Sequence, residues 1–275
     1  MMPQDPCADA SVALGNDVPD TDRAFYFPSN GGFMPGRYVT GPWDRRLQNG
    51  MALAGLAAHL VERTESPADM TTARLVIDLQ RPTPMGSVTP RVEVLREGKR
   101  LQIVQAEILH EGEVMVRATA MRVRNGESPP SDAEPPHALP DDLPSMNPRS
   151  PLLPVLETRL EQGGLEQLGP GIVWSRFHGD IVPGIPISPF VQLAMASDFG
   201  SGSSAYVDWR EWTFANVDIT LHLLRMPRGP WARVQARTRS AGNGIAVVET
   251  QLADLEGTVG HAHQTLFVDR NRRVK

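Results

Sequence analysis

Two stretches of the chain are apolar on almost every side and rich in Ala and Leu, a pattern that is typical of buried helices. They cover residues 47–61 and 189–199. The second stretch follows Ser188, a residue type that caps helix N-termini, and starts with Pro189 at the first helical position. The pattern therefore predicts one buried helix in each half of the chain.

Each predicted helix is followed by four strand-like runs that are separated by turns, most of which contain Gly. After the first helix the runs cover residues 73–80, 88–95, 102–109 and 114–123. After the second helix they cover residues 215–224, 232–238, 245–252 and 259–268. One buried helix followed by an antiparallel meander is an α+β layout, and we expect each sheet to wrap its helix.

The turns recur in both halves at a nearly constant offset. Gly98 lies 144 residues before Gly242, and Gly112 lies 145 residues before Gly257. A repeat of this length indicates duplication of a whole domain, because solenoid repeats have periods of about 20–50 residues.

Nine of the 25 prolines fall between Ser128 and Pro154. Proline fixes φ and lacks a backbone donor, so this segment is expected to be an extended or irregular linker. We divide the chain into a disordered or extended segment (1–24), an N-terminal unit (25–127), the linker (128–154) and a C-terminal unit (155–275).

Composition narrows the function classes. The net charge of −5 argues against a general nucleic-acid binder, which usually has a basic face. The single cysteine, Cys7, excludes an intrachain disulfide and favours a reducing compartment. There is no basic residue before Arg23 and no apolar run of membrane-spanning length, so we expect a soluble, cytoplasmic protein without a signal peptide or a membrane span.

The sequence lacks the common motifs of nucleotide-binding proteins, serine hydrolases and zinc peptidases. His261 and His263 share one face of a predicted strand, a spacing that metal sites use, but no third ligand is nearby. We therefore expect no metal, and interpret both histidines as solvated or hydrogen-bonded.

Asp198 ends the second apolar helix, where a carboxylate is unfavourable with the helix dipole. It is either a helix-terminal carboxylate that reaches solvent or a general base, whose pKa burial beside Met195 and Phe199 would raise.

Gln264 falls on an otherwise apolar strand face, where an unpartnered amide costs about 1–3 kcal/mol. It either bonds the backbone or orients a polar group in the core. Alternation places Asn216 on the polar face of its strand with Asp218 and Thr220, opposite the apolar Val217, which predicts contact with solvent.

The duplicated unit, with Ala196-Ser-Asp-Phe199 in the second helix, the run 212–225 in the next strand and Gln264 in the last strand, resembles the acyl-CoA thioesterase II family of double-hotdog proteins. The resemblance covers residues 25–268 outside the linker. It implies a tandem hotdog with two continuous sheets. It also implies hydrolysis of an acyl-CoA to a free acid and CoA, with no cofactor other than the CoA of the substrate.

The resemblance also assigns roles to residues. In the family an Asp, a Gln and a Ser or Thr hold the attacking water; the first two match Asp198 and Gln264, and the hydroxyl position falls on Asn216. An Asn side chain can both donate and accept, so it can still position water. Gly50, near the start of the first helix, is the candidate oxyanion donor; otherwise it only permits tight packing. The acyl tunnel would be lined by Phe190, Met195 and Phe199.

The first copy is expected to be structural. The positions 144 residues before the candidate site residues are Ala54, Thr72 and Ala120. From the resemblance we also expect a homodimer of double hotdogs.

Two other functions remain open. One is an enoyl- or hydroxyacyl-thioester hydratase or dehydratase, in which Asp would pair with His222 or His263. The other is a non-catalytic double hotdog that binds an acyl thioester or a lipid.

Overall fold

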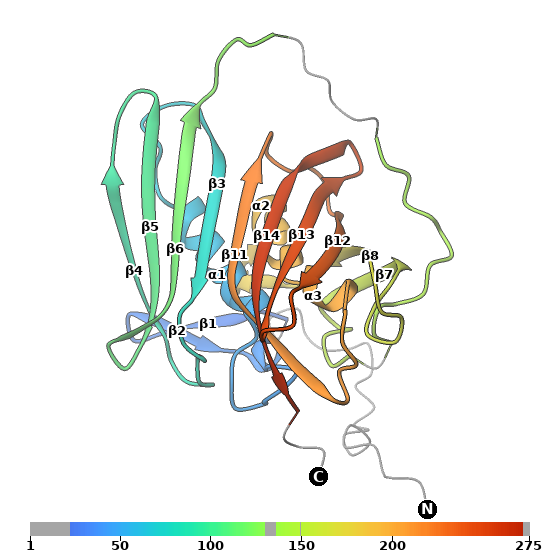
Figure 1. The fold of residues 1–275 in the computed structure, drawn as a ribbon. Coiled ribbons are helices and arrows are strands. Elements are labelled where there is room, and N and C mark those ends of the chain that lie inside the picture. Colours follow the sequence, from blue (N-terminus) through green and yellow to red (C-terminus); the bar gives the residue numbers. More distant parts are fainter. Residues whose placement is uncertain (1–22, 130–135, 149, 272–275) are drawn as a thin grey trace, which may run out of the picture.

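The computed structural model describes residues 23–129, 136–148 and 150–271. Most of the predicted N-terminal segment, residues 1–22, therefore lies outside the described residues. Among those described, ten strands form one curved antiparallel sheet that contains both halves of the chain (Figure 1). The predicted α+β class and the double-hotdog architecture are confirmed.

The four strands predicted for each half are present. In the first half they are β3 (Met70–Leu79), β4 (Thr89–Arg96), β5 (Leu101–His110) and β6 (Glu113–Arg124). In the second half they are β11 (Trp212–Leu223), β12 (Ala232–Ser240), β13 (Ile245–Asp254) and β14 (Gly257–Arg270). Two further strands, β7 (Leu156–Gln162) and β8 (Gly171–Phe177), extend the sheet beyond β12. The sequence analysis missed β7 because this edge strand has no clear alternation of apolar and polar side chains.

The two halves join through β3 and β11. These central strands pair antiparallel, with Ile219 opposite Ile77 and Leu221 opposite Leu75. All four side chains are fully buried. The sheets of the two halves are therefore continuous, as expected, and they share one hydrophobic core.

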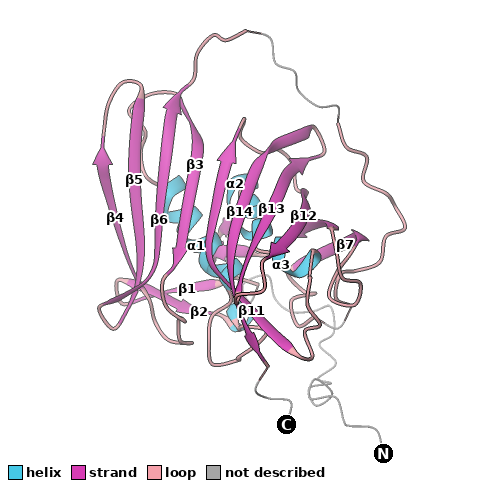
Figure 2. Cartoon of the chain, viewed as in Figure 1, coloured by secondary structure: helices cyan, strands magenta, loops and turns pink. Residues whose placement is uncertain are grey.

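Two helices lie side by side against one face of the sheet (Figure 2). They are α1 (Gly50–Glu62) and α2 (Pro189–Ser197), and a short α3 (Gly200–Ser203) follows α2. Helix α1 starts three residues later than predicted, because Asn49 is its cap and accepts a hydrogen bond from the Ala52 N–H. The predicted cap of α2 is confirmed: Ser188 accepts from the Val191 N–H.

Short hairpins precede both helices. They are β1 (Tyr26–Ser29) with β2 (Gly32–Pro35), and β9 (Asp180–Val182) with β10 (Ile185–Pro186). In the linker segment 128–154, the described residues form no helix or strand.

The strand register repeats between the halves with the offset of 144 residues. Ala120 pairs with Leu75 in the first half, just as Gln264 pairs with Ile219 in the second. The helices follow a different offset, because their caps Asn49 and Ser188 are 139 residues apart. Counted from the caps, the residue equivalent to Asp198 is His59 and not Ala54, which corrects the offset-based expectation.

A β-bulge overturns the expected orientation of Asn216. In the pairing of β11 with β14 the register skips Val217, so Asn216 pairs with Leu266 and faces the core side of the sheet. Val217 is exposed instead. The alternation rule failed because one extra residue reverses the phase of all side chains that precede it. The first half has the equivalent bulge at Ala73, where the register with β6 skips from Thr72 to Arg74.

Candidate active site

Asp198 is the C-cap residue of α2, and its carboxylate is held by groups from both halves of the chain. The Asn216 side chain donates from Nδ2 to Asp198 Oδ1 over 2.6 Å. The backbone N–H of Met51, in the first turn of α1, donates a second hydrogen bond to Asp198. The structure therefore brings Asp198 and Asn216 together, and adds the N-terminus of α1.

Gly50 makes this approach possible. A Cβ atom placed on Gly50 would lie only 2.8 Å from Asp198 Oδ1, so a side chain at this position would displace the carboxylate. The positive end of the α1 dipole stabilises the negative charge there. This contact explains why a carboxylate is tolerated at the unfavourable end of α2.

Burial raises the pKa of Asp198 to about 6, and the hydrogen bonds from Asn216 and Met51 oppose this rise by favouring the charged form. At neutral pH the carboxylate is therefore ionised, with a basicity well above that of an ordinary aspartate. Such a group suits general-base catalysis, for which the most effective pKa lies near the working pH.

Gln264 reaches the same place from β14. It is fully buried, and its Nε2 donates to the backbone oxygen of Asp198 over 3.4 Å. Its Oε1 faces Gly200, where an added Cβ would collide with it and would also lie 3.0 Å from Thr250 Oγ1 on β13. Gln264 thus fixes the chain just after α2, and Gly200 leaves room for its amide.

Three polar atoms around this turn are buried without a hydrogen-bond partner in the described part of the chain. They are Asn216 Oδ1, Gln264 Oε1 and Thr250 Oγ1. Leaving a buried polar atom without a hydrogen bond costs about 1–3 kcal/mol of stability. A water or a polar ligand beside these three atoms would restore their hydrogen bonds.

The structure places the three residues expected to line an acyl tunnel at different points along α2 and just after it. Met195 is fully buried between the helices, 2.7 Å from the Cβ position of Gly55 in α1. Phe199 stacks on Phe177 with ring centroids 6.4 Å apart. Phe190, at the other end of α2, lines a separate hollow away from Asp198.

Sequence reasoning missed Met51, Gly200 and Thr250. Met51 and Thr250 show no local pattern that separates them from core residues, because only their tertiary neighbours give them a role. The glycine that follows Asp198-Phe199 was a usable signal, since a Gly between two helical segments often marks a close approach of another group.

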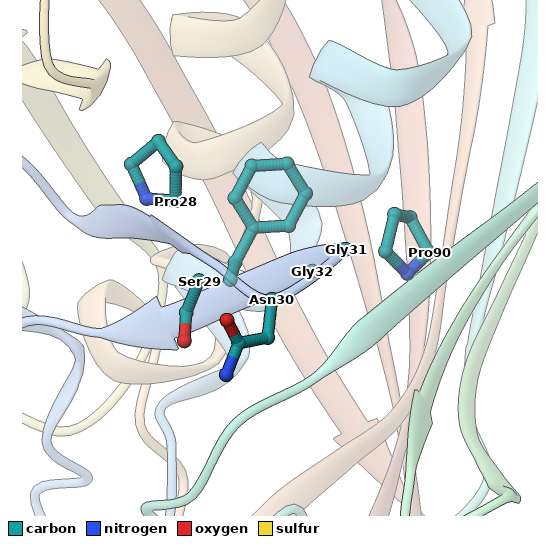
Figure 3. Close-up of a pocket in the computed structure, with 7 residues that line it drawn as sticks. Pro28, Ser29, Asn30, Gly31, Gly32 and Pro90 are labelled. Carbon is teal, nitrogen blue, oxygen red and sulfur yellow. The ribbon is translucent and has the colours of Figure 1, made fainter.

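A different hollow lies between the turn of the β1–β2 hairpin and β4 (Figure 3). Its lining residues are Pro28, Ser29, Asn30, Gly31, Gly32, Phe33 and Pro90. None of these side chains titrates, so this hollow offers no acid or base for catalysis.

The histidines considered in the sequence analysis lie elsewhere. His222, His261 and His263 are exposed on the outer face of the sheet, whereas Asp198 and Asn216 lie on the inner side. An Asp–His pair of the hydratase type is therefore not formed by these residues. Within the described ranges no cluster of three potential metal ligands occurs, and no helix is both long and apolar enough to span a bilayer.

The fold and the site define a duplicated hotdog protein with a buried carboxylate at the junction of its two copies. The chain belongs to the acyl-CoA thioesterase family: the model for the acyl-CoA thioesterase N-terminal domain matches residues 39–123, and the model for the C-terminal domain matches residues 130–268. The protein is therefore a thioester hydrolase, as the resemblance implied.

Solved structures show the same fold. The acyl-CoA thioesterase II TesB2 from Mycobacterium marinum is 21% identical, with a TM-score of 0.65 over 81% of this chain and 90% of that chain. A hotdog-fold protein of unknown function from Alicyclobacillus acidocaldarius is 18% identical, with a TM-score of 0.72 over 90% and 97%. A putative thioesterase II from Thermobifida fusca is 15% identical, with a TM-score of 0.70 over 92% and 99%. A search of curated proteins found no match.

Proposed function

We propose that the protein hydrolyses an acyl-CoA to a free acid and CoA, and that Asp198, Asn216 and Gln264 position the attacking water. The observation that carries this proposal is the Asp198 carboxylate, whose pKa of about 6 results from burial and which contacts both Asn216 and the N-terminus of α1.

The chemistry needs no group beyond water and the side chains and backbone of this chain. Asp198 takes a proton from the water while the water oxygen adds to the thioester carbonyl, which becomes an oxyanion. The oxyanion then re-forms the carbonyl, the carbon–sulfur bond breaks, and the CoA sulfur leaves with the proton that Asp198 held. Asp198 is thereby returned to its ionised form, and we propose that no cofactor takes part.

Asn216 can replace the family's hydroxyl because a primary amide has both a donor and an acceptor. Its Nδ2 already donates to Asp198, and its Oδ1 has no partner among the described residues. In the proposed complex this oxygen accepts a hydrogen bond from the water, so that the water lies between Asn216 and the base.

The first turn of α1 supplies the candidate oxyanion donors. The first four N–H groups of a helix have no partner within the helix, and the helix dipole favours negative charge at this end. The N–H of Gly50 is the first of these groups in α1, beside Asp198, and nothing but hydrogen projects from its Cα. We assign the oxyanion contact to Gly50 on this basis.

The replacement Asp198→Asn tests the base. It keeps the size of the side chain and one acceptor oxygen but removes its basicity, so the release of CoA from an acyl-CoA panel should fall by about 10²–10⁴-fold. In the wild type the rate should rise with pH up to about 6 and then level off, because only ionised Asp198 accepts a proton.

The matched control is Asp218→Asn on β11, the strand that also carries Asn216. Asp218 Oδ1 accepts a hydrogen bond from the Thr265 N–H, and the amide oxygen of Asn can accept the same bond. It should keep the wild-type rate. Equal rates for Asp198→Asn and wild type would refute the catalytic assignment. If the wild type binds an acyl-CoA but releases no CoA, the result would favour the alternative of a non-catalytic binding protein over a hydrolase.

We also propose a homodimer. Its support is an apolar patch on the outer face of the sheet, formed by Ile245, Val247 and Phe267, which are 41–58% exposed. Ile245 and Phe267 are paired neighbours on β13 and β14, so the patch is continuous. Sedimentation equilibrium should give twice the chain mass of 30.1 kDa, and a single-chain mass would contradict the dimer.

A further inference from the structure

The junction between the two copies has a second end. At the first end the N-terminus of α1 meets Asp198 near the C-terminus of α2. At the other end, the N-terminus of α2 meets Glu62 at the C-terminus of α1. Ser188, the cap of α2, donates from its hydroxyl to Glu62 Oε1 over 2.8 Å. The two ends are related by the duplication, and each has a carboxylate facing the start of the other helix, but Glu62 lies three residues after His59, the residue equivalent to Asp198.

A hollow of about 320 Å³ opens at this second end. Its polar lining consists of Glu62, Thr64, Ser66, Thr72 and Arg122, and its apolar lining consists of Met70, Phe190 and Met226. Ligand pockets typically have volumes of about 300–1,000 Å³ and combine apolar walls with a few polar groups, so this hollow suits the reactive end of a small acyl compound.

Two of its residues occupy positions equivalent to those of the candidate active site. Thr72 precedes the bulge on β3, just as Asn216 precedes the bulge on β11. The two residues are 144 positions apart. Phe190 is the second residue of α2, as Met51 is the second residue of α1. The hollow therefore occupies the place of a second active site.

Thr72 brings a hydroxyl to this end of the junction. The residue is only 5% exposed and lines the hollow. A hydroxyl that lines a hollow can donate a hydrogen bond to a carbonyl or to another polar group of a ligand.

The same comparison explains why such a ligand would not be hydrolysed. Pro189 occupies the helix position of Gly50 and has no N–H to donate to an oxyanion. Ala120 occupies the position of Gln264. Glu62 Oε1 already accepts the Ser188 hydroxyl, and Arg122 is engaged by carbonyls at the end of α1, including Val61 at 2.6 Å and Thr64 at 2.8 Å.

We infer that the hollow between Thr72, Phe190 and Met226 is a second acyl-CoA site, which holds the thioester end of the ligand without cleaving it. This inference rests on the proposed function, because the ligand class follows from the correspondence with the Asp198 site. Thr72 donates to the thioester carbonyl, and Phe190, Met70 and Met226 contact the short acyl chain.

Isothermal titration of the full chain with the butyryl ketone analogue of CoA, in which a CH2 group replaces the thioester sulfur, tests the inference, because this compound keeps the carbonyl but cannot be hydrolysed. The wild type should show two binding events per chain. Thr72→Val keeps the shape of the side chain but removes the hydroxyl, and should weaken one event about 5- to 10-fold. Met226→Trp should abolish that event by filling the hollow, whereas Leu224→Ala, a control at a 75% exposed side chain, should change neither event.

The outcomes separate the two proposals. A single event that neither Thr72→Val nor Met226→Trp changes would overturn the second site and leave the proposed function standing. A single event that both variants weaken, with no CoA release from butyryl-CoA by the wild type, would support the second site and refute the proposed function. No binding event at all would overturn the second site, and CoA release would then decide the function alone.

Discussion

The two halves share one strand register but differ in the polar residues that line their common junction. In the second half, Asp198 and Gln264 contribute a carboxylate and an amide. The equivalent residues of the first half are His59 and Ala120. Burial lowers the pKa of His59, with a further contribution from Arg63, so His59 is uncharged at neutral pH. The first half thus provides neither an anionic base nor the buried amide at these positions.

Instead, the first half uses its buried cation for stability. Arg122 donates to the backbone oxygen of Val61 and to Gln102 Oε1, over 2.6 and 2.9 Å, at the C-terminal end of α1. A cation at this end of a helix interacts favourably with its dipole. The position 144 residues later is Leu266, which packs in the core. The two copies thus use this strand position differently, for helix capping in the first half and for core packing in the second.

The first half nevertheless contributes to the proposed active site. The carboxylate of the second half lies against Gly50 and Met51 of the first, so neither half contains the whole site. If Asp198 is the base, as we propose, the first half is more than a structural copy, because it supplies the groups that surround the carboxylate.

Among the variants that compare the two halves, the largest expected effect comes from Gly50→Ala. The added Cβ would lie 2.8 Å from Asp198 Oδ1, so the carboxylate must move away from Asn216 and the α1 N-terminus. We expect the rate of CoA release to fall by about 100-fold, since small displacements of catalytic groups have large effects. The free energy of unfolding should change by no more than about 1 kcal/mol, because Ala is the better helix former.

Gly126→Ala is the matched control, because an added Cβ there meets nothing within 4 Å. It should leave both the rate and the stability unchanged. A Gly50→Ala variant with the wild-type rate would show that the first half has only a structural role.

A smaller effect is expected from exchanging Asn216 and Thr72, the residues that precede the two bulges. Asn216→Ala removes the 2.6 Å hydrogen bond to Asp198 and should reduce the rate by about 10- to 100-fold, as a bond to a charged group contributes about 1.5–3 kcal/mol. Asn216→Thr restores a donor and an acceptor in one hydroxyl and should stay within about 10-fold of wild type.

The reciprocal change, Thr72→Asn, should leave the rate of CoA release unaltered, because Thr72 lies at the other end of the junction. Measurement of CoA release by the three variants checks the comparison. A large loss in Thr72→Asn with little loss in Asn216→Ala would reverse the roles that we assign to the two halves.

The sequence by itself determined the helix and the four-strand meander of each half, because apolar periodicity and turn residues are local properties. It also determined the duplication, since the glycine turns recur at offsets of 144 and 145 residues. Asp198 and Gln264 were recognisable as polar residues within apolar elements.

Only the tertiary structure decided how these residues meet. The bulge at Val217 turns Asn216 toward Asp198, and alternation along an isolated strand cannot reveal a bulge that depends on the pairing with β14. The contact of Asp198 with Gly50 and Met51 joins residues almost 150 positions apart, from two copies of one unit. Its physical basis is the packing of α1 against α2, which brings the dipole of one helix to the carboxylate that ends the other.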